Sequence, residues 1–361
     1  MTLRVASGIG YVMGSAVGII ANPVSARDIR RVIANATALQ ITDRANIVLR
    51  VLSCLRACGV DHVYMMPENG GIRHHVRRGI DRAENQGLKH FPRVEHLDYK
   101  ISGTVEDTFK AARMMKEKGA SAIVVLGGDG THRAVVTACG DVPIAGISTG
   151  TNNAFPEHRE PTITGLAVGL AISGKVPPEV AFLPNKKILV RVDGHEEIAL
   201  VDVAVVTERY IGARALWRTE TFRELFVTFA DPEVIGMSAI AGLLTPVTRL
   251  DPHGLHVNMA PEEAANIVLD TPIAPGYMRG IGIRDFEPME PGVVYRPQIT
   301  DGSIALDGER ELSFTRDNDV TIELVPNAFL TVNVSGCMQY ASRHGLMRLN
   351  RSANQQPYGG N

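Results

Sequence analysis

Short apolar runs alternate with longer amphipathic stretches over the first 160 residues of the chain. The run AVGIIA (16–21) is followed by a segment that Thr42 opens and Gly59 closes. Within that segment, apolar residues recur at helical spacing: Val48, Val51, Leu52 and Leu55. The next apolar run, VDHVYMMP (60–67), completes a strand-helix-strand unit, which is typical of a parallel sheet covered by helices.

The same alternation continues toward residue 150. The pattern predicts helices over 72–86, from Thr104 to Gly119 and over 132–139, and strands over 93–99, 121–128 and 142–148. The run SAIVVLGG (121–128) is continuously apolar at its centre, so we expect a central strand buried on both faces.

The pattern changes after Pro161. One more helical segment (162–173) precedes alternating runs in which Asp-Gly pairs mark hairpin turns, as in KKILVRVDGHEEIALVDVAVV (186–206). The segment ITDGSIALDGERELSF (299–314) predicts three strand-like pieces around two such pairs. Residues 210–250 carry no pattern that assigns them.

We therefore predict an α/β plus β protein. An N-terminal Rossmann-like parallel α/β domain covers residues 1–160, and a mainly antiparallel, β-sandwich-like domain covers 161–329. Residues 330–346 are candidates to return to the first domain, and 347–361 resemble a flexible tail.

The amino-acid composition argues against some classes of binding partner. The 361 residues are 45% hydrophobic and 21% charged, with a formal net charge of −2, so no basic field favours nucleic acid or an anionic membrane. The four cysteines are scattered, which favours reduced, buried thiols in a cytoplasmic protein. Residues 5–26 are uncharged and superficially resemble a signal peptide or short membrane span, but glycines dilute them and AVGIIANP (16–23) has the pattern of a strand followed by a turn. We expect the first dozen residues to be a leader to this strand.

The chemistry concentrates in VVLGGDGT (124–131), where the central strand ends. Gly127, Gly128 and Gly130 allow backbone conformations closed to other residues and a close approach to a ligand. The helix that follows near Thr131 directs its amides and positive dipole end at this loop, an arrangement that suits a phosphate. Asp129 would repel a phosphate unless it binds Mg²⁺ or accepts a proton from an attacking hydroxyl.

A second polar loop, STGTNNAF (148–155), follows the next strand and contains Gly150, Thr151, Asn152 and Asn153. Because ligands of open α/β sheets bind at the carboxyl ends of the strands, the two loops predict one nucleotide or phosphate site. The alternative is that Gly-Gly-Asp-Gly is an ordinary turn.

These residues resemble a known superfamily. GGDGTHRAV (127–135), with GIIANPVSARDIRR (18–31) and GTNNAFP (150–156), is similar to the signatures of ATP-NAD kinases and of diacylglycerol and sphingosine kinases, and most similar to the acetoin catabolism protein X branch. The resemblance implies an NAD kinase-like fold, ATP and Mg²⁺ as ligands, NAD as a substrate, and homo-oligomers.

The resemblance also implies roles for individual residues. Asn22 and Ser25 match a nucleotide loop in which Ala26 replaces the usual glycine, and Phe155 closes a second matching motif. In that second motif Asn152 and Ala154 replace a glycine and an aspartate. The phosphate-binding set it implies is Asn22, Ser25, Gly127, Gly128, Gly130, Thr131, Gly150, Thr151, Asn152 and Asn153.

The second domain departs from the NAD kinase pattern. Val201 replaces an expected asparagine and Asp202 the following acid, which removes an amide able to recognise a nucleotide edge. Asp307 and Glu309 match an Asp-Gly-Glu turn of both branches, although a plain hairpin turn explains them equally well.

Other residues are weaker candidates. His132 follows the glycine loop and is either a ligand contact or a surface histidine at a helix start. His74 and His75 lie in a basic stretch with Arg73, Arg77 and Arg78, for which a solvated helix face is favoured. Trp217, flanked by Arg214 and Arg218, is either a base-stacking residue or a packing anchor.

The leading hypothesis is a cytoplasmic phosphotransferase that moves phosphate from ATP to a hydroxyl of NAD or a related metabolite, with a link to acetoin catabolism. Two alternatives stay open. One is a lipid kinase, although no segment is typical of membrane binding. The other is a nucleotide-binding regulator without turnover, which Val201 motivates.

Overall fold

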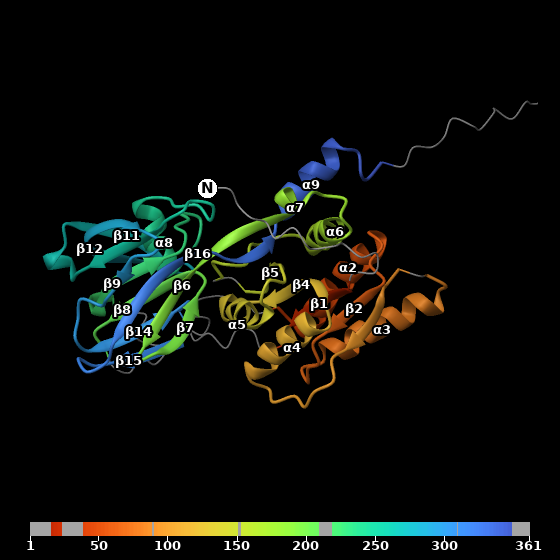
Figure 1. The fold of residues 1–361 in the computed structure, drawn as a ribbon, viewed down its shortest axis with the longest axis horizontal. Coiled ribbons are helices and arrows are strands. Elements are labelled where there is room, and N and C mark those ends of the chain that lie inside the picture. Colours follow the sequence, from red (N-terminus) through yellow and green to blue (C-terminus); the bar gives the residue numbers. More distant parts are fainter. Residues whose placement is uncertain are drawn as a thin grey trace, which may run out of the picture.

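The computed structural model describes residues 16–23, 39–88, 90–150, 153–208, 219–308 and 310–348. Within them, two sheets organise the chain (Figure 1). The first has nine strands in the order β3-β2-β1-β4-β5-β16-β6-β7, with β13 also paired to β16. The second has seven strands in the order β11-β12-β10-β9-β8-β14-β15.

The strands and helices of the N-terminal half are β1 (Ala16–Ala21), α2 (Ile41–Ala57), β2 (His62–Met65), α3 (Ile72–Asn85), β3 (Arg93–His96), α4 (Glu106–Glu117), β4 (Ala120–Gly127), α5 (Asp129–Cys139), β5 (Ile144–Ser148), α6 (Pro161–Ile172) and α7 (Pro178–Ala181). Those of the C-terminal half are β6 (Phe182–Val192), β7 (His195–Ala199), β8 (Asp202–Val206), η2 (Thr219–Thr221), β9 (Phe222–Val227), α8 (Met237–Leu244), β10 (Gly254–Met259), η3 (Glu262–Ala264), β11 (Ile267–Ala274), β12 (Tyr277–Met289), β13 (Val294–Tyr295), β14 (Gly302–Leu306), β15 (Arg310–Phe314), β16 (Val320–Val332) and α9 (Val334–Arg343).

The parallel half of the first sheet reverses its strand order between β1 and β4. Strands β1 to β5 pair in parallel, and both faces of β4 are buried, as its apolar sequence predicts. Helices α2, α3, α6 and α9 pack on one face with Val124, whereas α4 and α5 pack on the other with Val125. This change of face identifies the β1/β4 junction as the topological switch point, where open α/β sheets bind ligands.

Predicted and observed elements agree in kind and differ at their ends. Gln40, not Thr42, is the N-cap of α2, where its side chain and that of Asp43 form a capping box. α5 begins at Asp129, three residues before the predicted start, so the glycine motif supplies its first turn. The predicted third strand, 93–99, is ordered as a strand only over β3.

A long ribbon of β6 and β16 connects the two halves of the molecule (Figure 1). At one end, Thr331 of β16 pairs in parallel with Ile144 of β5. Further along, Ile188 and Ile322 pack in one core with Phe226 and Ile304 of the second sheet. The ribbon therefore belongs to the first sheet and also forms one layer of a sandwich with the second sheet.

Two of the predicted Asp-Gly turns are hairpin turns. Asp193 and Gly194 join β6 to β7 with φ of 50° and 80°, and Asp307 and Gly308 join β14 to β15 with φ of 50° and 70°. The Asp301-Gly302 pair is not one, because Gly302 is the first residue of β14. The segment 299–314 thus contains two strands in place of the predicted three.

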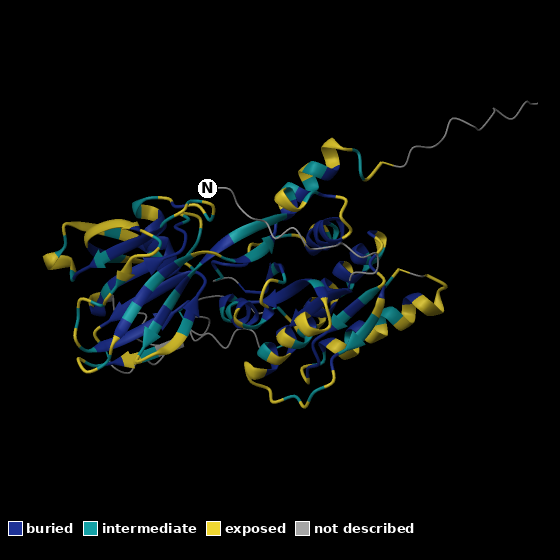
Figure 2. Ribbon diagram, in the orientation of Figure 1, coloured by how far each residue is buried: buried dark blue, intermediate teal, exposed yellow. Residues whose placement is uncertain are grey.

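Buried residues follow the strands, and exposed residues cover the outer faces of the helices and hairpins (Figure 2). All four cysteines are free and buried, as predicted. In the part of the chain that the structure describes, no helix is long and apolar enough to cross a bilayer.

Candidate functional site

The candidate site lies at the β1/β4 switch point, where three loops meet. The backbone N–H of Asn22, directly after β1, donates to the carbonyl of Leu126 in β4 at 3.3 Å. Its side-chain amide donates to the hydroxyl of Thr131 in α5, also at 3.3 Å. From the next strand end, the N–H of Thr149 lies 3.4 Å from the carbonyl of Gly127. The structure thus brings the predicted loops together.

Gly127 and Gly128 are required for space, and none of the three glycines is required for an unusual dihedral angle. Gly127, Gly128 and Gly130 have no positive φ, and Gly128 is extended at φ −95°, so the first of the two predicted reasons is wrong. A Cβ on Gly127 would lie 2.5 Å from the Thr131 side chain. One on Gly128 would lie 2.8 Å from the Asn153 side-chain oxygen. Packing within the motif at Gly127, and against the second loop at Gly128, therefore excludes larger side chains at these two positions.

Asp129 is the best-placed acid of the site. It lies in the first turn of α5, 8% exposed. One carboxylate oxygen accepts the backbone N–H of Phe155 at 2.9 Å, and the other accepts that of Ala154 at 3.1 Å. The two amides hold the carboxylate in one orientation at the positive end of the helix dipole.

The 148–155 loop is tied at its base. Ser148 Oγ donates to the carbonyl of Gly150 at 3.0 Å and accepts from the side-chain amide of Asn153 at 2.9 Å. The amide of Asn153 is thereby engaged within its own loop, whereas its oxygen faces Gly128. This arrangement fixes the distance between the loops on either side of the helix N-terminus.

The site has one carboxylate where a metal would be expected. Among the described residues, no group of three or more His, Cys, Asp or Glu side chains could hold a metal ion. Mg²⁺ commonly uses one or two carboxylates together with substrate phosphates and water. Asp129 therefore has the chemistry of a single carboxylate ligand for an ion that arrives with a nucleotide.

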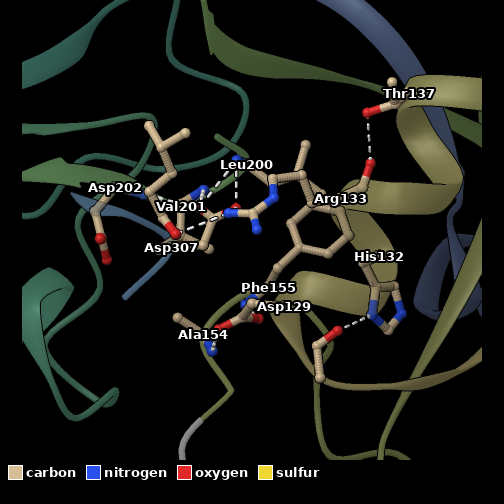
Figure 3. Close-up of polar contacts among 12 residues, drawn as sticks. Asp129, His132, Arg133, Thr137, Ala154, Phe155, Leu200, Val201, Asp202 and Asp307 are labelled. Atoms are coloured by element: carbon tan, nitrogen blue, oxygen red, sulfur yellow. Dashed lines mark hydrogen bonds and ion pairs between the residues drawn. The ribbon is translucent and has the colours of Figure 1, made fainter. Parts of the chain in front are cut away.

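Asp307, a weaker candidate from the sequence, is bonded to the protein's own backbone (Figure 3). Its carboxylate, fully buried, accepts the backbone N–H groups of Leu200 at 3.0 Å, Val201 at 2.8 Å and Asp202 at 3.3 Å. Consecutive amides of this kind form an anion-binding nest, which the protein fills with its own carboxylate. Burial raises the pKa of Asp307, while Arg133 and the amides oppose that shift.

Arg133 joins this nest to the glycine motif. It lies on α5 and donates to the carbonyl of Leu306 at 2.7 Å and to the Asp307 carboxylate at 3.5 Å (Figure 3). Asp202 begins β8 and is buried beside Asp307, and the Val201 side chain is also buried. Through Arg133, α5 is therefore anchored to Leu306 and Asp307 at the end of β14.

His132 is neither a ligand contact on the surface nor an exposed helix-start residue. Its side chain is fully buried beneath the loop, and its Nδ1–H donates to the carbonyl of Gly128 at 2.8 Å. Burial lowers the pKa of His132 to about 4, with a smaller contribution from Arg249, so the ring is neutral at physiological pH. The ring supports the glycine loop from the core side.

Several other candidates can now be placed. Arg73, His74, Arg77 and Arg78 are exposed on α3, as expected of a solvated face, and His75 is half-buried. Glu68 accepts the N–H groups of Gly71 and Arg73, so the α3 N-terminus is already capped. Residues outside the described part of the chain are Ser25, Thr151, Asn152, Arg214, Trp217, Arg218 and Glu309.

Two cations escaped the sequence reasoning. Arg249 reaches from the second domain to the carbonyls of Ala154 and Phe155, at 3.1 and 2.7 Å. Lys186 of β6 is buried beneath the loop that carries Arg249, where its ammonium donates to the carbonyl of Asp251. The sequence around residue 249 does not single out Arg249, because the segment 210–250 has no clear periodicity. Arg133, in contrast, lies inside the glycine motif, and that position is a signal for a role at the site.

Comparison with known proteins gives matches over nearly the whole chain. Residues 17–171 match the ATP-NAD kinase N-terminal domain, and residues 186–327 match the acetoin catabolism protein X C-terminal domain. Acetoin catabolism protein X of Cupriavidus necator is 50% identical over 350 residues, which cover 95% of this chain and 97% of that protein.

Solved structures are more distant. A candidate diacylglycerol kinase from Bacillus anthracis is 12% identical with a TM-score of 0.46, over 88% of this chain and 97% of the other. Yeast NADH kinase complexed with NADH is 14% identical with a TM-score of 0.44, over 96% of this chain and 91% of the other.

Proposed function

Because the chain belongs to the acetoin catabolism protein X family, and its first half matches the ATP-NAD kinase domain, we propose that it is an ATP-dependent phosphotransferase. The acceptor is a hydroxyl of NAD or of a related metabolite. The name of the Cupriavidus necator relative supports a link of this reaction to acetoin catabolism.

One observation carries the proposal: Asp129 lies in the first turn of α5, held by the amides of Ala154 and Phe155. The same helix terminus provides backbone N–H groups suited to nucleotide phosphates. Phosphoryl transfer needs positioning and charge stabilisation more than covalent chemistry by the protein. A fixed carboxylate beside a phosphate-binding terminus meets both needs.

In this mechanism each residue has a separate task. The α5 amides and the hydroxyl of Thr131, which already accepts from Asn22, bind the phosphates. Asp129 accepts the proton of the attacking hydroxyl as the acceptor oxygen bonds to the γ-phosphorus of ATP, the bond from that phosphorus to the β,γ-bridging oxygen breaks, and ADP is the leaving group. In the alternative role Asp129 would hold a Mg²⁺ ion that arrives with the nucleotide, and that ion would neutralise phosphate charge.

The acceptor site is expected to differ from that of a typical NAD kinase. Val201 offers no polar side-chain group and is 1% exposed, and its N–H is engaged by Asp307 at 2.8 Å. Recognition of a nucleotide edge at this position is therefore excluded, and a smaller hydroxylated metabolite becomes a candidate beside NAD.

The proposal is tested with purified protein, ATP and Mg²⁺ and a panel of NAD, NADH, acetoin and related small alcohols, and diacylglycerol. We expect ADP release and a phosphorylated product with NAD or a small alcohol. Turnover with diacylglycerol alone would indicate a lipid kinase. Nucleotide binding without turnover on any acceptor would indicate a regulator, the alternative that Val201 favours.

The role of Asp129 makes a specific prediction. We expect Asp129→Asn to lower kcat by about 10²- to 10⁴-fold, because a general base is lost, while the Kd for ATP changes little. Steady-state kinetics and calorimetric titration with ATP measure the two effects. The control is Asp81→Asn, an exposed aspartate of α3 that pairs only weakly with Arg77 at 3.9 Å. Near-normal kcat in Asp129→Asn would contradict the assignment.

A further inference from the structure

The peptide group between Ala154 and Phe155 is bonded on both sides. Its N–H, on Phe155, donates to Asp129 at 2.9 Å, and its carbonyl, on Ala154, accepts from the guanidinium of Arg249 at 3.1 Å. The same guanidinium also donates to the carbonyl of Phe155 at 2.7 Å. A single peptide unit therefore connects a cation of the second domain with the carboxylate of the first.

Hydrogen bonds that are linked in series through one peptide group strengthen one another. A cation on a peptide oxygen polarises the group and makes its N–H a better donor, so the carboxylate beyond it is held more firmly. Burial lowers the pKa of Arg249, and the nearby carboxylates of Glu157, Asp129 and Asp231 oppose that shift. Arginine stays protonated under these conditions.

The guanidinium itself is held in place. It lies 4.8 Å from the ring centroid of Phe155 and 4.1 Å from that of Phe229, within the range of cation–π contact. One ring belongs to the loop that the guanidinium binds and the other to the second domain. The contact therefore lies at the seam between the domains, the surface where α5 and the 154–155 loop meet Arg249, Phe229 and Leu306.

The loop that carries Arg249 is fixed from below by Lys186. The Lys186 ammonium donates to the carbonyls of Thr248, Asp251 and His253 at 3.1, 2.7 and 2.6 Å. Burial lowers the pKa of Lys186 to about 8, so the ammonium remains charged at neutral pH, with one acceptor for each proton. In the same turn the Asp251 carboxylate accepts the N–H of Thr248 at 2.6 Å.

We propose that Arg249 is a positioning residue, which acts through the Ala154–Phe155 peptide to hold Asp129 in its reactive orientation. This inference rests on the proposed function, in which Asp129 carries the chemistry. If Arg249 has this role, the Asp129 carboxylate of the first domain is ordered only when the second domain, which carries Arg249, is correctly packed against it.

The test compares Arg249→Met, Arg249→Lys and Arg296→Gln. Methionine keeps apolar packing between the two rings but has no charge or donor, and lysine keeps the charge with a different donor geometry. Arg296 is an exposed arginine of the second domain that pairs with Asp319 and does not contact the 154–155 loop. Kinetics and amide hydrogen exchange are measured on each full-length protein.

We expect Arg249→Met to lower kcat tenfold or more, with KM for ATP changed less than threefold, and Arg249→Lys to recover part of the loss. Exchange of the Ala154 and Phe155 amides should rise at least tenfold in Arg249→Met, with exchange in β4 unchanged. Arg296→Gln should match wild type in both measurements.

Different results would contradict the proposed function and the positioning role of Arg249. Absence of wild-type turnover on every acceptor would refute the proposed function, and the exchange measurement would then decide the role of Arg249 alone. Unchanged protection of the Ala154 and Phe155 amides in Arg249→Met would overturn the positioning role. So would a kcat equal to that of wild type in an active enzyme.

Discussion

Asp129 and Asp307 carry the same carboxylate and differ in what surrounds it. Asp129 accepts two amides at the start of a helix, beside the loops of the switch point. Asp307 is enclosed by three amides and Arg133, which leaves its oxygens no exposure to a ligand. At the scale of single residues, the number and origin of the donors separate an acid available for chemistry from an acid that organises the backbone.

His132 predicts a pH dependence of stability. Its pKa is about 4 in the folded protein and near 6.5 in an unfolded chain. Between these values the unfolded state binds a proton that the folded state does not, so the free energy of unfolding falls as pH decreases from 6.5 to 4. The loss approaches about 3 kcal/mol, at 1.36 kcal/mol for each pH unit of difference.

Urea unfolding of wild type and His132→Asn between pH 7 and pH 4.5 measures this contribution. The variant should start less stable at pH 7, because the fit around the ring is lost, and should lose less stability as the pH falls. Equal slopes in the two proteins would exclude His132 as a source of acid sensitivity.

At the scale of elements, close approach of helices is set by small residues. Gly165 and Gly169 of α6 face α2, and a Cβ on Gly169 would lie 2.5 Å from the Cβ of Cys58. The Cys58 Cβ is attached directly to the α2 backbone, so it cannot move alone. The apolar sequence of α6 therefore packs closely against α2 only because glycines leave room for the partner.

We predict opposite effects of two glycine-to-alanine changes. Gly169→Ala should destabilise the protein by about 1–3 kcal/mol, since overpacking outweighs the roughly 1 kcal/mol gain in helix propensity. Gly79→Ala in α3 should be neutral or stabilising by up to about 1 kcal/mol, because its Cβ meets only the movable end of the Leu49 side chain. Chemical denaturation of both variants measures the difference, and equal effects would contradict the packing argument.

At the scale of the whole molecule, the two halves are joined by a shared ribbon and by side chains across the seam. β6 and β16 pair with each other along their lengths and reach β5 through Thr331. Arg133 and Arg249 cross the seam in opposite directions, each toward backbone carbonyls of the other half. We therefore expect the domains to unfold together.

Asp307→Asn tests this cooperation. Loss of the buried charge that faces Arg133 should destabilise the protein by about 3 kcal/mol, and calorimetry should still record one transition with a lower Tm. Asp193→Asn is the matched control, with the same φ of 50° in an exposed hairpin turn, and should cost less than about 1 kcal/mol. Two separate transitions in Asp307→Asn would show that the halves unfold independently.

Much of the fold was predictable because its signals are local. Apolar runs and helical spacing identify β1, β4 and α2, and the Asp-Gly pairs at 193 and 307 identify two hairpins. The candidate site was predictable in part for the same reason, since its glycines and Asp129 lie within five consecutive residues. Element ends were less certain, because capping by Gln40 and the early start of α5 depend on the neighbouring loops.

By itself, the sequence determined which elements form in the N-terminal half and where the glycine loop lies, because hydrophobic period and glycine spacing act over a few residues. Only the tertiary structure decided what Asp307, His132 and Arg249 do. Arg249 and its partner Phe155 are 94 positions apart, and Asp307 and Leu200 are 107 positions apart. His132 bonds to Gly128, only four positions away, but the surrounding core decides its burial. Such contacts depend on how sheets pack across a seam, and no local pattern of residues encodes that packing.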